Sequence, residues 1–421
     1  MIRHLVLLGL GPGHLRLLQE LLKKRPGDVA ISLISRQKRY VSDAAVLQVV
    51  AGRVAAADGG VLLEPLLRAA TVRQLHHQVQ AIDPAAKVLL LDDGRELRFD
   101  WLSLEPEPAQ NRDATELALP GARANGLFTR PCEAFCTLWP RVAELATERP
   151  LSVAVICGGP GVSHVDPGGT PTVEVTAPLP LENADTAPAS AATPSSRPEA
   201  IHWADEKFAI ELAFAVRRAL AGSAVTFITG GRPVAEGCHP ALQNCLQVAL
   251  KERRITVLID AAKSIQSGEV VLQSGARLSC DVPLLALSAA PPAWLASSGL
   301  ARDVTGQVSV DATNRSTSHP HVLAHAPRQT ADQTAHQTQC QTQGQTPSWA
   351  RAPAYPSAAS ARRLAASLCA LMDNQAPAAS RALRQPHALA PSQWIDTADG
   401  QMVLGWRGWA WQSWVAGLAR R

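Results

Sequence analysis

The sequence predicts an α/β fold with two doubly wound, three-layer domains and a small C-terminal domain. Residues 2–9 form a short apolar run that leads into Gly9-Leu10-Gly11-Pro12-Gly13-His14, and leucines at helical spacing follow. A second apolar run at 29–35 completes a βαβ unit, whose right-handed crossover makes the strands parallel. The same signals return after Leu151, where an apolar run ends in Cys157-Gly158-Gly159-Pro160-Gly161.

Length and composition limit the class of protein. A chain of 421 residues is long enough for two to three domains. The net charge of +4 is small and the basic residues are scattered, which argues against a nucleic-acid partner. The eight cysteines form no CxxC pair and no secretory leader precedes the first strand, so a reducing cytoplasm fits best.

An uncharged stretch at 282–301 could be mistaken for a membrane span. Pro283, Pro291 and Pro292 interrupt this stretch, and serines dilute it. We therefore expect a buried strand followed by a turn.

Two segments of low complexity interrupt the predicted domains. Residues 162–200 are rich in Pro, Thr, Ala and Ser, and residues 328–348 repeat a Gln-Thr unit, so neither can bury a core. Without the first segment, a helix at 203–220 and a strand at 224–229 complete the second unit. The predicted division is a first domain built from 1–122 and 301–371, a second domain at 123–300, and a C-terminal domain at 372–421.

The first glycine turn has the features of a phosphate-binding turn. A Gly-x-Gly-x-x-Gly turn between strand and helix lets the backbone approach a pyrophosphate, and the helix N-terminus supplies free N–H donors. Gly9 and Gly11 meet this need, whereas the third position is His14. The acid expected after the second strand is replaced by Ser35-Arg36. The alternative is a tight turn in a purely structural unit, but its place after an N-terminal strand favours dinucleotide binding.

Further segments follow the glycine turns in a recognisable order: Asp92–Leu97, Phe99–Leu104, Leu119–Ala122, Ala209–Ala213 and Ser274–Leu278. Together they resemble the pyridine nucleotide-disulfide oxidoreductase superfamily. The resemblance is strongest to type II NADH dehydrogenases and to the flavoprotein modules fused to selenide, water dikinase. In that branch His often stands at the third glycine position, and Ser often follows the second strand.

The resemblance implies an FAD-dependent enzyme that takes hydride from NAD(P)H and passes electrons to an acceptor, with quinone as the default. It implies Rossmann-like domains, with the NAD(P)H domain inserted into the FAD domain. No general acid or base is needed for hydride transfer, so no catalytic side chain is assigned. The implied FAD contacts are Gly9, Gly11, Pro12, Gly13, His14, Ser35 and Arg36, and the implied NAD(P)H contacts are Gly158, Gly159 and Glu211.

The chain departs from the family at both sites. Where the family has an Asp that binds the flavin, this chain reads His325-Ala326-Pro327, and residues 162–200 separate the second glycine turn from its helix. These departures leave a second hypothesis open. In it the chain is a catalytically degenerate flavoprotein-like scaffold that binds a partner or one nucleotide without turnover.

Other chemistry-bearing residues have simpler interpretations. Cys132 and Cys136 would share one face of a helix and could form a redox pair, but ordinary buried cysteines are favoured. His319, His321 and His325 match no familiar zinc spacing, which favours a strand preceded by a Pro turn.

The C-terminal tryptophans have two interpretations. Trp409 and Trp411 fit a strand that follows a turn at Arg407-Gly408, which favours packing of a small terminal domain. The second choice is peripheral contact with the inner face of the plasma membrane, where tryptophans and terminal arginines are both at home. The expected location is therefore the cytoplasm, with this membrane contact as the alternative.

Overall fold

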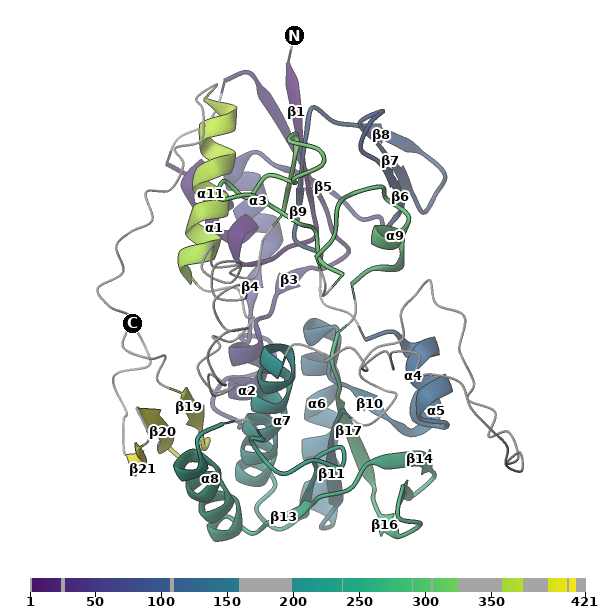
Figure 1. Cartoon of the computed structure of the whole chain (residues 1–421), viewed down its shortest axis with the longest axis vertical. Coiled ribbons are helices and arrows are strands. Elements are labelled where there is room, and N and C mark those ends of the chain that lie inside the picture. Colours follow the sequence, from purple (N-terminus) through teal and green to yellow (C-terminus); the bar gives the residue numbers. More distant parts are fainter. Residues whose placement is uncertain are drawn as a thin grey trace, which may run out of the picture.

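The chain builds two parallel sheets that lie one above the other in Figure 1. The structure is a computed structural model, and it describes residues 2–23, 27–106, 110–158, 199–236, 238–289, 291–303, 306–324, 358–373, 393–406 and 409–413. The predicted low-complexity segments 162–200 and 328–348 lie almost entirely outside these residues. Within the described residues, no helix is both long and apolar enough to cross a membrane.

The first sheet has the order β18-β9-β1-β2-β5, and all its strands are parallel. Its strands are β1 (Arg3–Leu8), β2 (Val29–Ile34), β5 (Arg73–Leu75), β9 (Trp101–Leu104) and β18 (Val322–Ala324). One face is covered by α1 (Pro12–Leu21), α3 (Leu63–Ala70) and α11 (Ala358–Met372). The other face is covered by an antiparallel sheet of β6 (Val79–Asp83), β7 (Val88–Leu91) and β8 (Glu96–Arg98).

The second sheet repeats this plan in the order β10-β17-β11-β12-β13. Its parallel strands are β10 (Leu127–Phe128), β11 (Ser152–Cys157), β12 (Ala224–Ile228), β13 (Ile255–Leu258) and β17 (Val282–Ala286). Helices α6 (Cys132–Glu148), α7 (Glu199–Ala219) and α8 (Pro240–Glu252) cover one face. The opposite face carries β14 (Ala262–Gln266), β15 (Glu269–Leu272) and β16 (Arg277–Ser279).

The predicted α/β class, the first glycine-turn unit, and the two strands and helix of the second unit are confirmed. Strand β17 followed by the short helix α9 (Ala293–Ala296) matches the buried strand and turn expected at 282–301. The short elements β3 (Arg39–Tyr40), β4 (Val61–Leu62), α4 (Arg112–Ala118) and α5 (Ala122–Asn125) lie in the connections. Helix α2 (Asp43–Val50) belongs to the N-terminal part of the chain, yet Val46, Val49 and Val50 pack into the core of the second domain.

One buried side chain joins the two connections between the domains. The chain passes to the second domain after β9 and returns to the first after β17. Gln110, on the outgoing connection, donates to the carbonyl oxygens of Leu285 and Leu287 at 2.8 and 3.0 Å. Its side-chain oxygen accepts from the amide of Arg130 at 3.2 Å. The outgoing and returning segments are thereby bonded to each other.

A third antiparallel sheet lies beside α8 (Figure 1). It consists of β19 (Gln393–Asp396), β20 (Met402–Trp406) and β21 (Trp409–Ser413). Trp406 pairs in register with Trp409, which confirms the predicted hairpin. Trp414, Arg420 and Arg421 lie outside the described residues, so the membrane contact stays a prediction.

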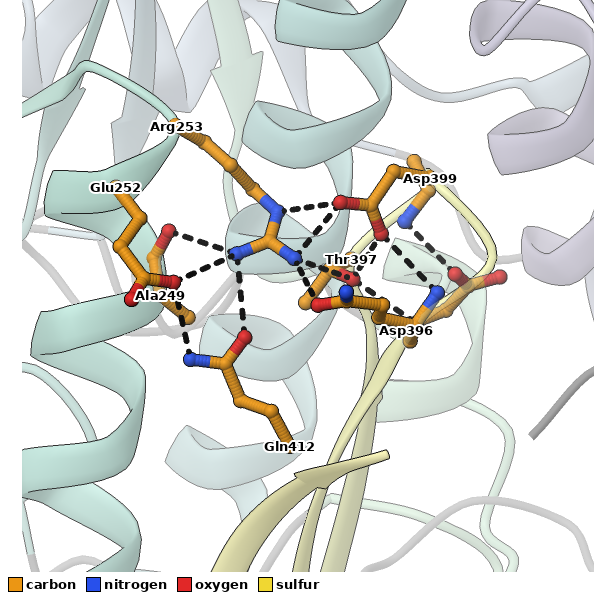
Figure 2. Close-up of polar contacts among 9 residues, drawn as sticks. Ala249, Glu252, Arg253, Asp396, Thr397, Asp399 and Gln412 are labelled. Carbon is orange, nitrogen blue, oxygen red and sulfur yellow. Dashed lines mark hydrogen bonds and ion pairs between the residues drawn. The ribbon is translucent and has the colours of Figure 1, made fainter. Parts of the chain in front are cut away.

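Arg253, at the C-terminal end of α8, holds this third sheet in place (Figure 2). Its guanidinium donates to Asp399 at 2.7 and 2.9 Å and to the side-chain oxygen of Gln401 at 2.8 Å. The carbonyl oxygen of Ala249 and the Gln412 side chain accept on its other side. A planar fork with five donors suits such a convergent set of acceptors, so one residue binds both the turn after β19 and strand β21.

Replacing this residue tests its role. We expect Arg253→Ala to lower the free energy of unfolding by about 2–4 kcal/mol, because several half-buried, charge-assisted bonds are lost together. Chymotrypsin should also cut more readily within residues 393–413. Urea unfolding and limited proteolysis measure the two effects, with Arg218→Ala, an exposed arginine on α7, as the control. Equal unfolding midpoints for the two variants would contradict the assignment.

Candidate dinucleotide-binding sites

The first glycine turn lies where a parallel sheet reverses its strand order. From β1 the chain proceeds through α1 to β2 on one side, while β9 flanks β1 on the other, with Leu8 opposite Leu104. The carboxyl ends of two such strands form the crevice in which open α/β sheets bind their ligands. Gly9 has a φ of 77°, and a Cβ built on it would lie 2.2 Å from the carbonyl oxygen of Glu105. Only glycine fits there.

His14, at the third position of the motif, is fully buried beneath the turn. Its Nδ1 lies 2.9 Å from the carbonyl oxygen of Gly9, and its Nε2 lies 2.7 Å from the hydroxyl of Ser103. A carbonyl oxygen can only accept, so Nδ1 carries a proton and donates to Gly9, while Nε2 shares a hydrogen bond with the Ser103 hydroxyl. The ring therefore fastens the turn to β9, and the steric conflict that its size suggests does not arise.

Glu105 is the site residue that the sequence reading missed. It follows the last residue of β9, and its carboxylate accepts from the amides of Gly13 at 3.0 Å and His14 at 2.5 Å. These amides belong to the first turn of α1, where they have no acceptor within the helix. The sequence contains one signal for this role: Glu105 is an acidic residue directly after the strand that neighbours β1.

Ser35 and Arg36 lie at the carboxyl end of β2, beside the glycine turn. The hydroxyl of Ser35 accepts from the amide of Gln37 at 3.2 Å, and Arg36 forms an ion pair with Asp92 in the turn between β7 and β8. His77, Asp92 and Asp93 could together hold a metal ion, but Arg36 and Arg95 already bind these side chains. We assign no metal to this cluster.

The first site adjoins the boundary between the domains. Arg130 forms a two-pronged ion pair with Asp43 of α2, with both nitrogen–oxygen distances 2.9 Å. The thiol of Cys132 lies 3.7 Å from the same carboxylate. Burial, together with the negative charges of Glu105 and Asp43, raises the pKa of Tyr40 far above its usual range. Cys132 and Cys136 are buried and form no disulfide with each other, as the simpler interpretation predicted.

The second glycine turn follows β11, the strand equivalent to β1. Cys157 and Gly158 are described, whereas Gly159 lies outside the described residues. Thr229-Gly230-Gly231-Arg232 follow β12, with both glycines in the left-handed region. The Thr229 hydroxyl is buried and has no hydrogen-bond partner among the described residues. A buried hydroxyl without a partner costs free energy unless a ligand or water supplies one.

Glu206, on α7, is a buried carboxyl group next to the second site. It accepts from the amide of Ala235 at 2.6 Å and so holds the loop that follows β12. Burial raises its pKa to about 7, although the Ala235 amide and the charge of Arg232 act in the opposite direction. Glu206 is therefore about half protonated at neutral pH, which limits its repulsion of a nearby phosphate.

Glu211 lies one turn further along α7. Its carboxylate forms an ion pair with Lys207 at 2.6 Å and accepts from the amide of Asp396 in β19 at 3.1 Å. Burial raises its pKa. The side chain joins α7 to the C-terminal sheet, and its expected place near a nicotinamide stays a prediction.

The histidines near the end of the first domain follow the simpler interpretation as far as they are described. His319-Pro320 forms the turn before β18, and His321 binds the carbonyl oxygen of Pro84 at 2.8 Å. His325, Ala326 and Pro327 lie outside the described residues.

Comparison with solved structures identifies the fold. A sulfide:quinone oxidoreductase from Aquifex aeolicus matches at a TM-score of 0.62 and 16% identity, over 98% of this chain and 88% of that one. A ferredoxin reductase from Rhodopseudomonas palustris matches at 0.63 and 16% identity, over 96% and 82%. A NAD-dependent persulfide reductase from A. fulgidus matches at 0.63 and 16% identity, over 95% and 63%. No protein-family model and no curated protein matches the chain.

These matches define the fold as the two-domain α/β fold of these solved oxidoreductases. They confirm at the level of the fold the resemblance found in the sequence. The identity is too low to transfer an acceptor or a substrate.

The main-chain N–H groups at the first turn suit the diphosphate of a dinucleotide. The carboxyl group of Glu105 accepts from the amides of Gly13 and His14, so two main-chain donors converge on one acceptor group. A carboxylate and a phosphate use the same donors at a helix N-terminus. At the second site, the free hydroxyl of Thr229 offers a contact to a sugar hydroxyl. The first turn therefore fits a diphosphate once the Glu105 side chain has moved, whereas the second turn lies outside the described residues from Gly159 onward.

The pKa of Glu206 makes the stability depend on pH. The folded state holds the proton up to about pH 7, whereas the unfolded chain releases it near the ordinary value of 4.5. The contribution of Glu206 to folding is thus fully present below pH 4.5 and falls as the pH rises through 7, by about 3 kcal/mol at most. Glu206→Gln should remove this part of the pH dependence and unfold at higher urea than the native chain at pH 8.

Unfolding midpoints at pH 5 and pH 8 provide the measurement. Glu144→Gln, which removes an exposed carboxyl group on α6, is the control and should follow the native pH profile. A parallel profile for Glu206→Gln would show that Glu206 is ionised throughout this range.

Proposed function

We propose that the chain is an FAD-dependent oxidoreductase that takes hydride from NAD(P)H and passes electrons to a small acceptor, with quinone as the default. The observation that carries this proposal is the anion-binding turn between β1 and α1, at the switch point of a two-domain fold. Bound FAD would supply the redox chemistry, because flavins accept hydride from nicotinamides. The cytoplasm is the proposed location.

The chain's own residues bind and orient. Gly9, Gly11, Pro12, Gly13 and His14 bring the main chain close to the diphosphate, and Ser35 and Arg36 lie at the adjacent sugar. The Asp43–Arg130 pair places fixed charges at the domain boundary beside Tyr40, where a cofactor's electronic properties would be tuned by nearby charge. Gly158, Gly159 and Glu211 are the proposed contacts of the second nucleotide.

The second site favours NADPH as the donor. An acid after the second strand of such a unit binds the ribose 2′-hydroxyl of NADH, whereas an arginine nearby accommodates the 2′-phosphate of NADPH. After β12 this chain places Thr229, two glycines and Arg232, and no acid among these four residues. Arg232 is half-exposed, and its one ion pair among the described residues is with the half-exposed Glu236 at 3.0 Å, so it is accessible to a phosphate.

A second candidate function is favoured by Glu105. If its carboxylate remains on the α1 amides, the chain is a catalytically degenerate scaffold that binds a partner or one nucleotide without turnover. The two functions differ in whether the purified protein holds flavin.

Spectroscopy separates the two functions. We expect the purified protein, after incubation with FAD, to show the visible flavin bands, and we expect NADPH under anaerobic conditions to bleach them. A colourless protein that takes up no FAD would favour the scaffold. A yellow protein that neither NADPH nor NADH reduces would contradict the proposed electron transfer.

The donor preference has its own test. Arg232→Ala should lower the ratio of affinities for 2′,5′-ADP and 5′-AMP by about tenfold or more, because a charge-assisted bond to the 2′-phosphate is lost. Calorimetric titration of both nucleotides measures this ratio without requiring turnover. Arg218→Ala serves as the control, and an unchanged ratio in Arg232→Ala would remove the arginine from the site.

A further inference from the structure

The start of α1 has no hydrogen-bond donor left for a phosphate. Pro12, the first residue of the helix, has no N–H group. The amides of Gly13 and His14 donate to the carboxylate of Glu105, and the amide of Leu15 donates to Gly11 within the helix. Every main-chain donor that a diphosphate would use between Pro12 and Leu15 is therefore already satisfied.

The space that the glycines leave open is also filled by Glu105. A Cβ built on Gly11 would lie 2.7 Å from the carboxylate, and one built on Gly13 would lie 2.9 Å from its Oε1. The side chain of Glu105 is only 3% exposed. The close approach that glycines normally offer to a pyrophosphate is here made by a residue of the chain itself.

The helix has no other cap. Gly11 at the N-cap position has no side chain, and the first turn of α1 contains no acidic residue. A negative charge near the N-terminus of a helix stabilises the helix. In the absence of ligand, the carboxylate of Glu105, directly after β9, acts as the N-terminal cap. The main chain of Glu105 is held by a bond from its amide to Leu8 at 2.9 Å, so departure of its carboxyl group would require rotation about the side-chain bonds and not movement of β9.

We propose that Glu105 is an internal competitor for the anion site, so that a diphosphate ligand enters the first dinucleotide site only after the Glu105 carboxylate has left the amides of Gly13 and His14. This inference rests on the proposed function for the identity of the ligand, FAD, but not for the competition itself. A ligand that binds only the vacated form has its apparent affinity reduced by the fraction of molecules in that form. Glu105 thus lowers the affinity of the native chain for every diphosphate.

The test compares Glu105→Gln and Glu105→Ala with the native chain. Glutamine keeps the size of the side chain and one oxygen acceptor but removes the charge, so we expect this variant to retain the fold. Alanine removes the whole group that fills the space beside Gly11 and Gly13. Glu116→Gln is the matched control, because Glu116 also accepts two main-chain amides, those of Gly121 and Arg123 at 2.8 and 2.7 Å, away from the glycine turn. The probes are inorganic pyrophosphate, ADP and FAD, titrated by calorimetry and by thermal shift.

We expect both Glu105 variants to bind pyrophosphate and ADP at least tenfold more tightly than the native chain, with Glu116→Gln unchanged. Their unfolding temperature without ligand should fall, and pyrophosphate should restore it. Unchanged affinities would overturn the proposal. Weaker binding of FAD by Glu105→Gln would also overturn it, because Glu105 would then support the ligand.

The same titrations distinguish this inference from the proposed function. Tighter pyrophosphate binding by the variants, with no FAD uptake by any form, would leave the competition standing and remove the flavin function. FAD uptake and reduction in the native chain, with no gain in the variants, would keep the function and remove the competition.

Discussion

The first helix begins with amides that have no acceptor within the helix, and the organisation of the first domain follows from how they are satisfied. A parallel sheet requires a crossover after each strand, and the tight crossover after β1 points these amides into the crevice between β1 and β9. Here Glu105 and His14 complete the crevice. The carboxylate caps the helix, while the imidazole ties the turn to Ser103. Hydrogen bonds from within the chain thus hold both the turn and the start of the helix.

Local signals in the sequence were sufficient for the repeated units. Apolar runs, glycine turns and helical periodicity predicted β1 to β2 and β11 to β12, and α7 was found although residues 162–200 separate it from its strand. The Trp406–Trp409 pairing was also predictable, because a hairpin joins neighbours in sequence. In each case the residues that define the element lie within a few positions of one another.

Contacts between distant residues were not predictable in the same way. Glu105 caps α1 from 91 to 92 positions away, and only the adjacency of β9 to β1 brings them together. Glu211 meets Asp396 across 185 positions, because the C-terminal sheet packs on the second domain. Helix α2 joins the core of the second domain although its neighbours in sequence belong to the first. Pairings of this kind depend on the tertiary arrangement, which the hydrophobic periodicity of the sequence does not reveal.

The bonds of Gln110 also determine how the two domains can move. This side chain binds the main chain at Leu285, in β17, and at Leu287, directly after β17, so the outgoing segment is bonded to the chain where it leaves the second domain. Any rearrangement of the domains that draws residue 110 away from β17 therefore breaks both bonds at once.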